Sequence, residues 1–242
     1  MDEMGKRSPT DRTQRSEVGP STALAYLDPQ YWDQRFSSEE HYEWFKDYSH
    51  FRHLIQEHMN PKSSVGICSR IVGNVSVAVE KMQKRLLSKG YIDIKVLEAD
   101  MLDLPFGNSC FDVVIEKGTM DVLFVDSGDP WNPRPTTVSK VLAMLEGVHR
   151  VLKPDGVFIS ISFGQPHFRR PLFESPEFTW SIEWKTFGDG FHYFFYILRK
   201  GRRLGDAKGS GQRSDIPSIY LLQEELEGED YIFRTDVDEL DN

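Results

Sequence analysis

Apolar positions follow two different patterns along the chain, and each predicts a kind of secondary structure. The run "FDVVIEKG", which starts at Phe111 and closes at Gly118, is short and mostly apolar, as in a strand buried on both faces. The run "GVFISISFG" from Gly156 predicts a second strand of this kind. Between them, residues 136–156 place apolar side chains at helical spacing and end in "KPDG", which predicts a helix that stops there.

Other segments predict the remainder of a sheet. The stretch "YIDIKVLEAD", residues 91–100, follows the turn "SKG" and is predicted to be a strand, and residues 180–201 predict an antiparallel hairpin around "GDG". Upstream, aromatic and aliphatic positions predict two amphipathic helices, the second ending near Pro61. Strands that alternate with helices and close with an antiparallel pair indicate an α/β, Rossmann-like, mostly parallel sheet with helices on both faces. Ligands of such sheets bind at the carboxyl ends of the strands.

Composition limits the classes of function. The 242 residues carry a net charge of -9, with acidic residues concentrated at the C-terminus, so a direct nucleic-acid partner is not expected and a basic protein partner is compatible. The sequence shows no membrane-spanning run and no signal peptide. The two cysteines have no metal-ligand spacing, so no metal site is expected and a reducing, cytoplasmic setting is favoured.

The ends of the chain differ in composition from its centre. Residues 1–24 are polar and rich in turn formers, which predicts a disordered tail. Residues 25–201 are predicted to form one domain, followed over 202–242 by the linker "GRRLGDAKGSGQRSD" and an acidic tail. That tail is expected to be solvated, with docking to a basic protein as the alternative.

Five stretches, in order between residues 31 and 201, carry a resemblance to a known family: "YWDQRF", "YEWFKDYSHFR", "LPFGNSCFDVVIEKGTMDVLF", "EGVHRVLKPDGVFISISFGQPHFRR" and "FGDGFHYFFYILRKG". They resemble the seven-β-strand, S-adenosylmethionine-dependent methyltransferases that modify lysines of translation elongation factor 1-alpha. The resemblance implies a class I methyltransferase domain, S-adenosyl-L-methionine as the cofactor and a protein substrate, elongation factor 1-alpha.

The family pattern also implies which residues hold the cofactor. Asp100 is expected to accept a hydrogen bond from the adenine amine, Met101 to pack near the ring, and Lys117 of "EKGT" to lie beside the cofactor. Each has an alternative interpretation that the sequence leaves open: Asp100 caps the turn "DMLDLP", and Lys117 is a solvated lysine at a strand end.

Three aromatic residues of the N-terminal helices match positions that cover the methionine end of the cofactor in the family: Trp32, Phe36 and Trp44. Phe36 stands where the family usually has a tyrosine, so the hydroxyl contact is missing there. The alternative is that these rings are core packing, since an aromatic stripe on a helix usually is.

The chemistry implied is the in-line transfer of a methyl group from a sulfonium to a lysine amine, which requires a neutral, aligned amine in a dry site. Aromatic faces suit the substrate channel because they exclude water and stabilise a cation. Asp121 is a possible acceptor near the amine, and His167 is a candidate base or an ordinary loop residue. The channel candidates are Tyr42, Trp131, Phe163, His167 and Phe168.

One segment departs from the family. After "SSV", the sequence "GICSRIVGNVSVAVEKMQ" contains neither the glycine-rich cofactor loop nor the acid that should bind the ribose. One βαβ unit takes about 30 residues or more, so residues 65–94 hold one unit where the fold needs two, a shortfall on the order of 15 to 20 residues. This spacing is consistent with an alternative splice form or a wrongly assigned exon boundary.

Several functions therefore remain open at this stage. The chain is a lysine methyltransferase whose cofactor site is weakened or rebuilt, or a non-catalytic form that acts as a binding module or folds poorly. A small-molecule methyltransferase is the alternative enzyme.

Overall fold

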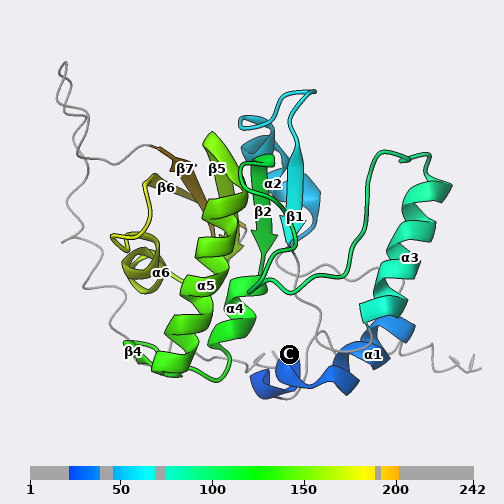
Figure 1. Ribbon diagram of the computed structural model, residues 1–242. Coiled ribbons are helices and arrows are strands. Elements are labelled where there is room, and N and C mark those ends of the chain that lie inside the picture. Colours follow the sequence, from blue (N-terminus) through cyan, green and yellow to red (C-terminus); the bar gives the residue numbers. More distant parts are fainter. Residues whose placement is uncertain (1–21, 39–45, 69–74, 189–191, 202–242) are drawn as a thin grey trace, which may run out of the picture. The chain divides into compact units, whose positions relative to one another are not determined.

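The computed structural model describes residues 22–38, 46–68, 75–188 and 192–201, and it contains a central sheet with helices on both faces (Figure 1). The sheet has five strands in the order β1-β2-β5-β7-β6. The strands are β1 (Val65–Cys68), β2 (Phe111–Lys117), β5 (Leu152–Ser162), β6 (Trp180–Phe187) and β7 (Tyr193–Lys200). The short strands β3 (Gly128–Asp129) and β4 (Asn132–Pro133) form a separate antiparallel pair.

Helices precede the sheet and connect its strands (Figure 1). The N-terminal part contains a 3₁₀ helix, η1 (Ala23–Leu27), then α1 (Pro29–Ser38) and α2 (Tyr48–Gln56). The connecting helices are α3 (Val75–Ser88), α4 (Thr119–Phe124), α5 (Pro135–Val151) and α6 (Pro166–Phe173).

The directions of the strands confirm the predicted combination of parallel strands with an antiparallel pair at the C-terminal side. Strands β1, β2 and β5 are parallel, with Val113 of β2 paired to Val65 on one side and to Val157 on the other. Strand β7 is antiparallel to both β5 and β6, which confirms the predicted hairpin. Strand β5 begins at Leu152, earlier than predicted, because Leu152 already pairs with Phe111 before the register shifts.

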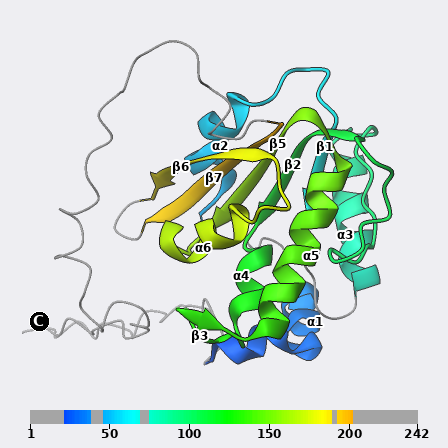
Figure 2. The ribbon, with the colours of Figure 1, turned by 60° about the vertical axis from the view of Figure 1, so that its left-hand side comes forward.

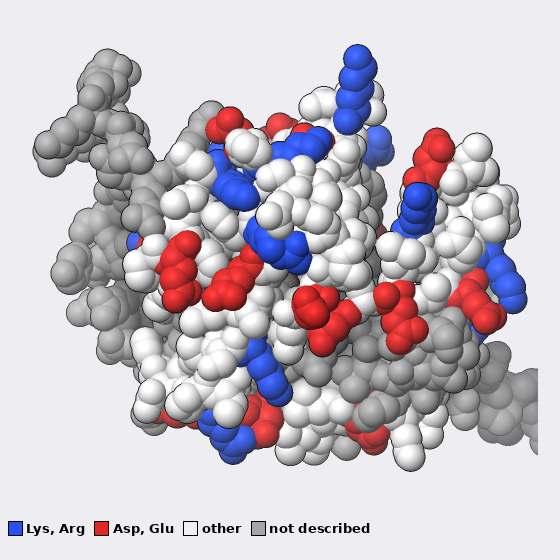
Figure 3. Space-filling view, in the orientation of Figure 1, with Lys and Arg blue, Asp and Glu red and all other residues white. Residues whose placement is uncertain are grey.

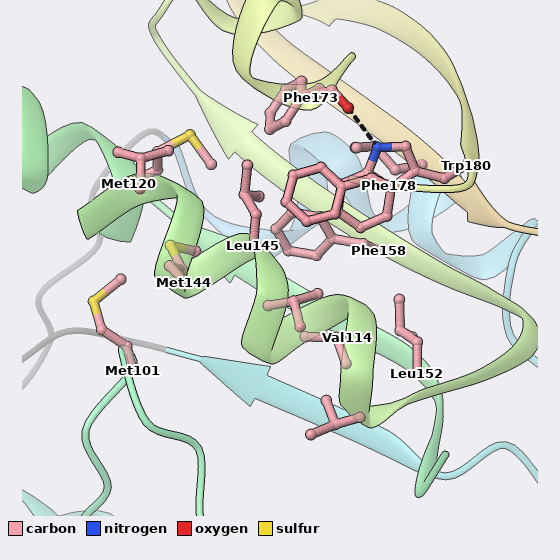
Figure 4. Packing of buried hydrophobic residues seen from close by; sticks show 14 of the residues in the cluster. Met101, Val114, Met120, Met144, Leu145, Leu152, Phe158, Phe173, Phe178 and Trp180 are labelled. Carbon is pink, nitrogen blue, oxygen red and sulfur yellow. Dashed lines mark hydrogen bonds between the residues drawn. The ribbon is translucent and has the colours of Figure 1, made fainter. Parts of the chain in front are cut away.

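Strand β2 separates two cores because successive side chains of a strand point to opposite faces. Val113 and Ile115 pack against the buried residues of α2, whereas Val114 packs with the inner face of α5. Figure 2 shows α4 and α5 on one face of the sheet and α2 on the other. Figure 4 shows the α5 side, where Leu145 and Phe158 are fully buried. Complete burial of such side chains stabilises the fold by about 1.5–3 kcal/mol each.

The predicted strand at residues 91–100 is wrong. Residues 91–99 form neither helix nor strand, and Asp100 makes only an isolated bridge to Asp103. The apolar side chains of the segment face solvent, with Ile92 77% exposed. A strand forms only where a neighbour supplies backbone hydrogen bonds, and no strand of the described residues flanks this segment.

The same region leaves one side of the sheet open. In the doubly wound order 3-2-1-4-5-6, two more strands lie beyond the first one, but within the described residues β1 ends the sheet. Ile67 of β1 is 76% exposed. Helix α3 does not compensate, because none of its side chains that the structure describes is buried.

The chain divides into two compact units, Met1–Leu204 and Gly205–Asn242, and all described residues belong to the first. Residues 1–21 of the predicted tail 1–24 lie outside the described residues, as does 202–242, whereas η1 begins at Ala23, inside the predicted tail. None of the described helices has the length and hydropathy to cross a membrane.

Candidate functional site

Buried polar side chains gather where β2 and β5 end and where the helices that follow them begin. Gly118 closes β2 with a φ of 71°, a left-handed conformation that glycine adopts without strain, so α4 starts immediately after the strand. Since the carboxyl ends of parallel strands share one edge of the sheet, residues of β2, α4, β5 and α6 meet there. The buried polar residues of these elements are Glu116, Thr119, Asp121, Ser160, Ser162 and Arg169.

Glu116 is completely buried and bonded at both carboxylate oxygens. Its Oε2 accepts hydrogen bonds from the backbone N–H groups of Thr119 (2.9 Å) and Met120 (3.2 Å), and its Oε1 accepts one from the hydroxyl of Ser160. Burial, reinforced by the negative charge of Asp121, raises the pKa of Glu116 to about 7. This carboxyl group therefore changes protonation state close to neutral pH.

Asp121 forms a buried ion pair. Its Oδ1 lies 2.6 Å from Nη2 of Arg169 and accepts a hydrogen bond from the hydroxyl of Ser162 at 2.5 Å. Both charged side chains are almost inaccessible, at 1% and 4% exposure. Its Oδ2 is also buried and has no hydrogen-bond partner among the described residues. The guanidinium of Arg169 thus pairs with Oδ1 of Asp121, and Oδ2 of the same carboxylate is left as an acceptor.

An aromatic surface, formed by Trp131, His167 and Phe168, lies on the outer side of α6. The ring of Trp131 stacks on His167, with centroids 5.0 Å apart and planes 19° apart, and meets Phe168 edge-on at 4.9 Å. Trp131 is 71% exposed. Burial lowers the pKa of His167. Three of the predicted channel residues therefore do lie together.

The other channel candidates are placed differently. Phe163, at the end of β5, is 43% exposed. Tyr42 lies outside the described residues, as does the predicted cofactor residue Trp44, and the side chain of Phe36 is not among those described.

Of the predicted cofactor residues, Lys117 and Trp32 occupy defined positions near α2 and η1. Lys117 ends β2 and donates from Nζ to the backbone oxygen of Lys46 (3.2 Å), with its ammonium 5.3 Å from the ring centroid of Phe51. Trp32 is 4% exposed, and its Nε1 donates to the backbone oxygen of Tyr26 at 2.8 Å. These contacts are compatible with packing as well as with a place beside a cofactor.

Asp100 and Met101 point in different directions. Asp100 is exposed, and its Oδ1 accepts a hydrogen bond from the backbone N–H of Leu102 (2.9 Å), which is the turn contact named above as the alternative. Met101 is buried against the same core as Val114 and Met144 (Figure 4). The chain therefore returns to the hydrophobic core at Met101.

A hollow of about 390 Å³ lies elsewhere, lined by residues from Phe173 to Ile182. Trp180, one of its lining residues, pairs with Lys200, next to the start of β5 rather than its end. This hollow therefore lies near the amino end of β5, whereas the buried polar cluster lies at its carboxyl end.

The sequence interpretation missed Glu116, Ser160, Ser162 and Arg169. A signal did exist for the first three, because each is a polar residue inside a run predicted to be a strand buried on both faces. The partners of these residues come from separate elements, and no local pattern pairs them.

Comparison with known proteins defines the class. A family model described as "Methyltransferase domain" matches residues 54–184, more than half of the chain. The crystal structure of the N-methyltransferase NodS from Bradyrhizobium japonicum, a complex with S-adenosyl-L-homocysteine, is 12% identical, covers 71% of this chain and 97% of that one, and has a TM-score of 0.50. The predicted Rossmann-like class I methyltransferase fold is confirmed.

More closely related proteins narrow the family. EEF1A lysine methyltransferase 4 from Bos taurus is 32% identical over 86% of this chain and 92% of its own length, and the protein of that name from Mus musculus is 34% identical over 76% and 80%. This chain belongs to the methyltransferase family that contains EEF1A lysine methyltransferase 4, as its motifs predicted.

The alignments also compare the length of this chain with the length of its relatives. The bovine alignment runs over 239 residues but takes in 86% of the 242 residues here, or about 208, so about 30 aligned positions have no counterpart in this chain. The bovine relative therefore carries additional residues inside the matched region, and the shortfall after Val65 stays a prediction.

Proposed function

We propose that this chain is an S-adenosylmethionine-dependent protein-lysine methyltransferase that acts on translation elongation factor 1-alpha in the cytoplasm. The carrying observation is the similarity to EEF1A lysine methyltransferase 4, which extends over nearly the whole length of the bovine protein. The names of the two relatives describe those proteins, and their substrate is taken as the hypothesis for this chain.

The buried polar cluster fits a cationic ligand. Two carboxyl groups, Glu116 and Asp121, are buried there, Arg169 pairs with Oδ1 of Asp121, and Oδ2 of Asp121 has no partner among the described residues. A site with this balance favours groups that carry positive charge or donate hydrogen bonds. When bound, S-adenosylmethionine supplies a methyl group on a positively charged sulfur. Lys117, Trp32, Asp100 and Met101 are the described residues proposed to hold it.

The chain's own residues would then orient the acceptor lysine. Asp121 offers Oδ2 as an acceptor for an N–H of the incoming amine, which holds the amine in place for in-line attack. The aromatic surface on α6 presents flat, water-excluding faces to an extended polypeptide. Tyr42 and Phe163 remain proposed members of the channel.

The surface charge is compatible with a protein substrate. Figure 3 shows Lys and Arg side chains scattered among Asp and Glu on one face. A basic stripe of the kind that binds nucleic acid is not seen among the described residues of that face.

A second candidate function follows from the open edge of β1. Because the described sheet ends at that strand and the relatives carry additional residues, the cofactor grip of this form is weakened, and the chain acts as a binding module for the same protein partner. A small-molecule methyltransferase is the enzymatic alternative.

Two measurements separate these possibilities. Calorimetry determines whether the 242-residue chain binds S-adenosylmethionine, beside a version in which the additional segment of the bovine relative is restored. Radiolabelled methyl transfer is then followed on purified elongation factor 1-alpha and on a panel of small metabolites. Binding by the chain as it stands, with transfer to the elongation factor, supports the proposal.

The other outcomes contradict the proposed methyltransferase activity on the elongation factor. Activity of the restored version alone makes this chain the non-catalytic form, and transfer to a metabolite alone identifies a small-molecule enzyme. Asp121→Asn serves as the matched variant, expected to lower kcat on the elongation factor because the amide presents a weaker acceptor, or an N–H, to the amine.

A further inference from the structure

Helix α6 has two sides with different partners. His167 and Phe168 contribute to the aromatic surface with Trp131, whereas the next residue, Arg169, points inward and is 3% exposed. Arg170 returns to the surface, where it pairs with Glu174. A buried guanidinium thus lies on the inward side of the helix that carries two of the three rings proposed to meet the substrate.

Arg169 joins three elements of the fold. Its Nη2 contacts Asp121 at 2.6 Å, and its guanidinium carbon lies 4.1 Å from the ring centroid of Phe124, so it contacts two residues of α4. Its Nε lies 3.4 Å from the hydroxyl oxygen of Ser162, the last residue of β5. One side chain of α6 therefore ties the helix to both α4 and the end of β5.

The segment between β5 and α6 is shaped around this guanidinium. A Cβ atom at Gly164 would overlap the guanidinium of Arg169. The backbone of Gly164 is held on both sides, since its N–H donates to the Ser162 hydroxyl at 2.8 Å and its carbonyl accepts from the Tyr196 hydroxyl at 2.6 Å. This bonding keeps the space for Arg169 constant.

We propose that Arg169 is a positioning residue for the protein substrate: it fixes α6 against α4 and thereby sets the aromatic surface at a constant place relative to Asp121. This inference rests on the proposed function, in which that surface contacts the polypeptide that carries the lysine. Lysine does not replace arginine here, because it lacks the planar fork and the flat face that covers Phe124.

Steady-state kinetics on purified elongation factor 1-alpha test the inference. Arg169→Lys is expected to raise the KM for the protein roughly tenfold, the effect of one weakened charge-assisted hydrogen bond. The affinity for S-adenosylmethionine and kcat change much less. Arg170→Lys, on the solvent side of the same helix, is the matched control and leaves the KM unchanged.

A double variant distinguishes positioning from general damage. If Arg169 acts through the aromatic surface, Trp131→Ala raises the KM on its own, and Arg169→Lys adds little in its presence. Additive effects, or equal effects of Arg169→Lys and Arg170→Lys on the KM, would overturn the inference.

A spectroscopic readout does not depend on activity. Protonated imidazole quenches a tryptophan stacked on it, so the fluorescence of Trp131, isolated by subtracting the signal of Trp131→Phe, titrates with His167. In Arg169→Lys the midpoint is expected to move toward that of an exposed histidine as the stack loosens, while Arg170→Lys leaves it in place. An unchanged midpoint refutes the positioning role, whereas a wild-type chain without methyl transfer refutes the proposed function.

Discussion

The buried carboxyl group of Glu116 makes the stability of the protein depend on pH in a direction opposite to that of an ordinary paired carboxylate. Its pKa is raised from 4.5 to about 7 in the folded protein. Below pH 4.5 the group is protonated in both the folded and the unfolded chain, so its ionisation contributes nothing. As the pH rises, the unfolded chain loses this proton first, and the free energy of unfolding falls until the pH passes the folded pKa.

The size of the effect follows from the shift. One pKa unit corresponds to about 1.4 kcal/mol, so the raised pKa predicts a loss of about 3 kcal/mol between pH 4.5 and pH 7. Glu116→Gln removes the titration and keeps the geometry. The amide oxygen accepts from the N–H groups of Thr119 and Met120, and the amide nitrogen donates to the Ser160 hydroxyl.

Urea unfolding of both proteins between pH 5 and pH 8 measures the effect. The difference between wild type and Glu116→Gln is the relevant quantity, because every other titrating group contributes to both curves. Relative to wild type, the variant is expected to gain stability as the pH rises, by about 1.4 kcal/mol per pH unit up to pH 7. A difference that stays constant across this range would refute the raised pKa of this buried carboxyl group.

Three further substitutions test the packing and the sheet edge. Gly164→Ala should lower the free energy of unfolding by about 1–3 kcal/mol through its overlap with Arg169, whereas Gly107→Ala, whose added methyl meets only ordinary contacts, should not. Phe51→Ala should cost about 3–5 kcal/mol, measured by thermal unfolding, because the ring is 4% exposed between α2 and the sheet; a loss under about 1 kcal/mol contradicts that packing. Ile67→Lys should reduce light scattering at high protein concentration without lowering the melting temperature, because a charge protects a free strand edge.

The strands that were predicted correctly are those whose neighbours are present. The runs starting at Phe111 and Gly156 are buried on both faces and pair with each other, so the local pattern and the tertiary environment agree. Residues 91–100 also have a pattern typical of a strand, yet they stay outside the sheet. Pairing depends on a flanking strand, and a local pattern does not report whether one is present.

The candidate site was likewise predicted only in part. The expected methyl-transfer chemistry pointed to Asp121, which lies in the buried cluster, and to the rings of Trp131, His167 and Phe168, which contact one another. Arg169 was not predicted, because an arginine beside "PHF" has the appearance of an ordinary surface residue. Its burial depends on a glycine and an aspartate from two other elements, which only the tertiary structure places around it.

Within the described residues one side of β1 is unpaired, which would make self-association of the protein depend on its concentration. Folding is a reaction of one molecule, whereas pairing through a free strand edge involves two, so its rate rises with the square of the concentration. Strand β1 has the sequence "VGIC", without the charge or proline that usually blocks such pairing. Abundance in the cell would then decide, as much as any contact within the fold, how long a molecule of this chain stays monomeric.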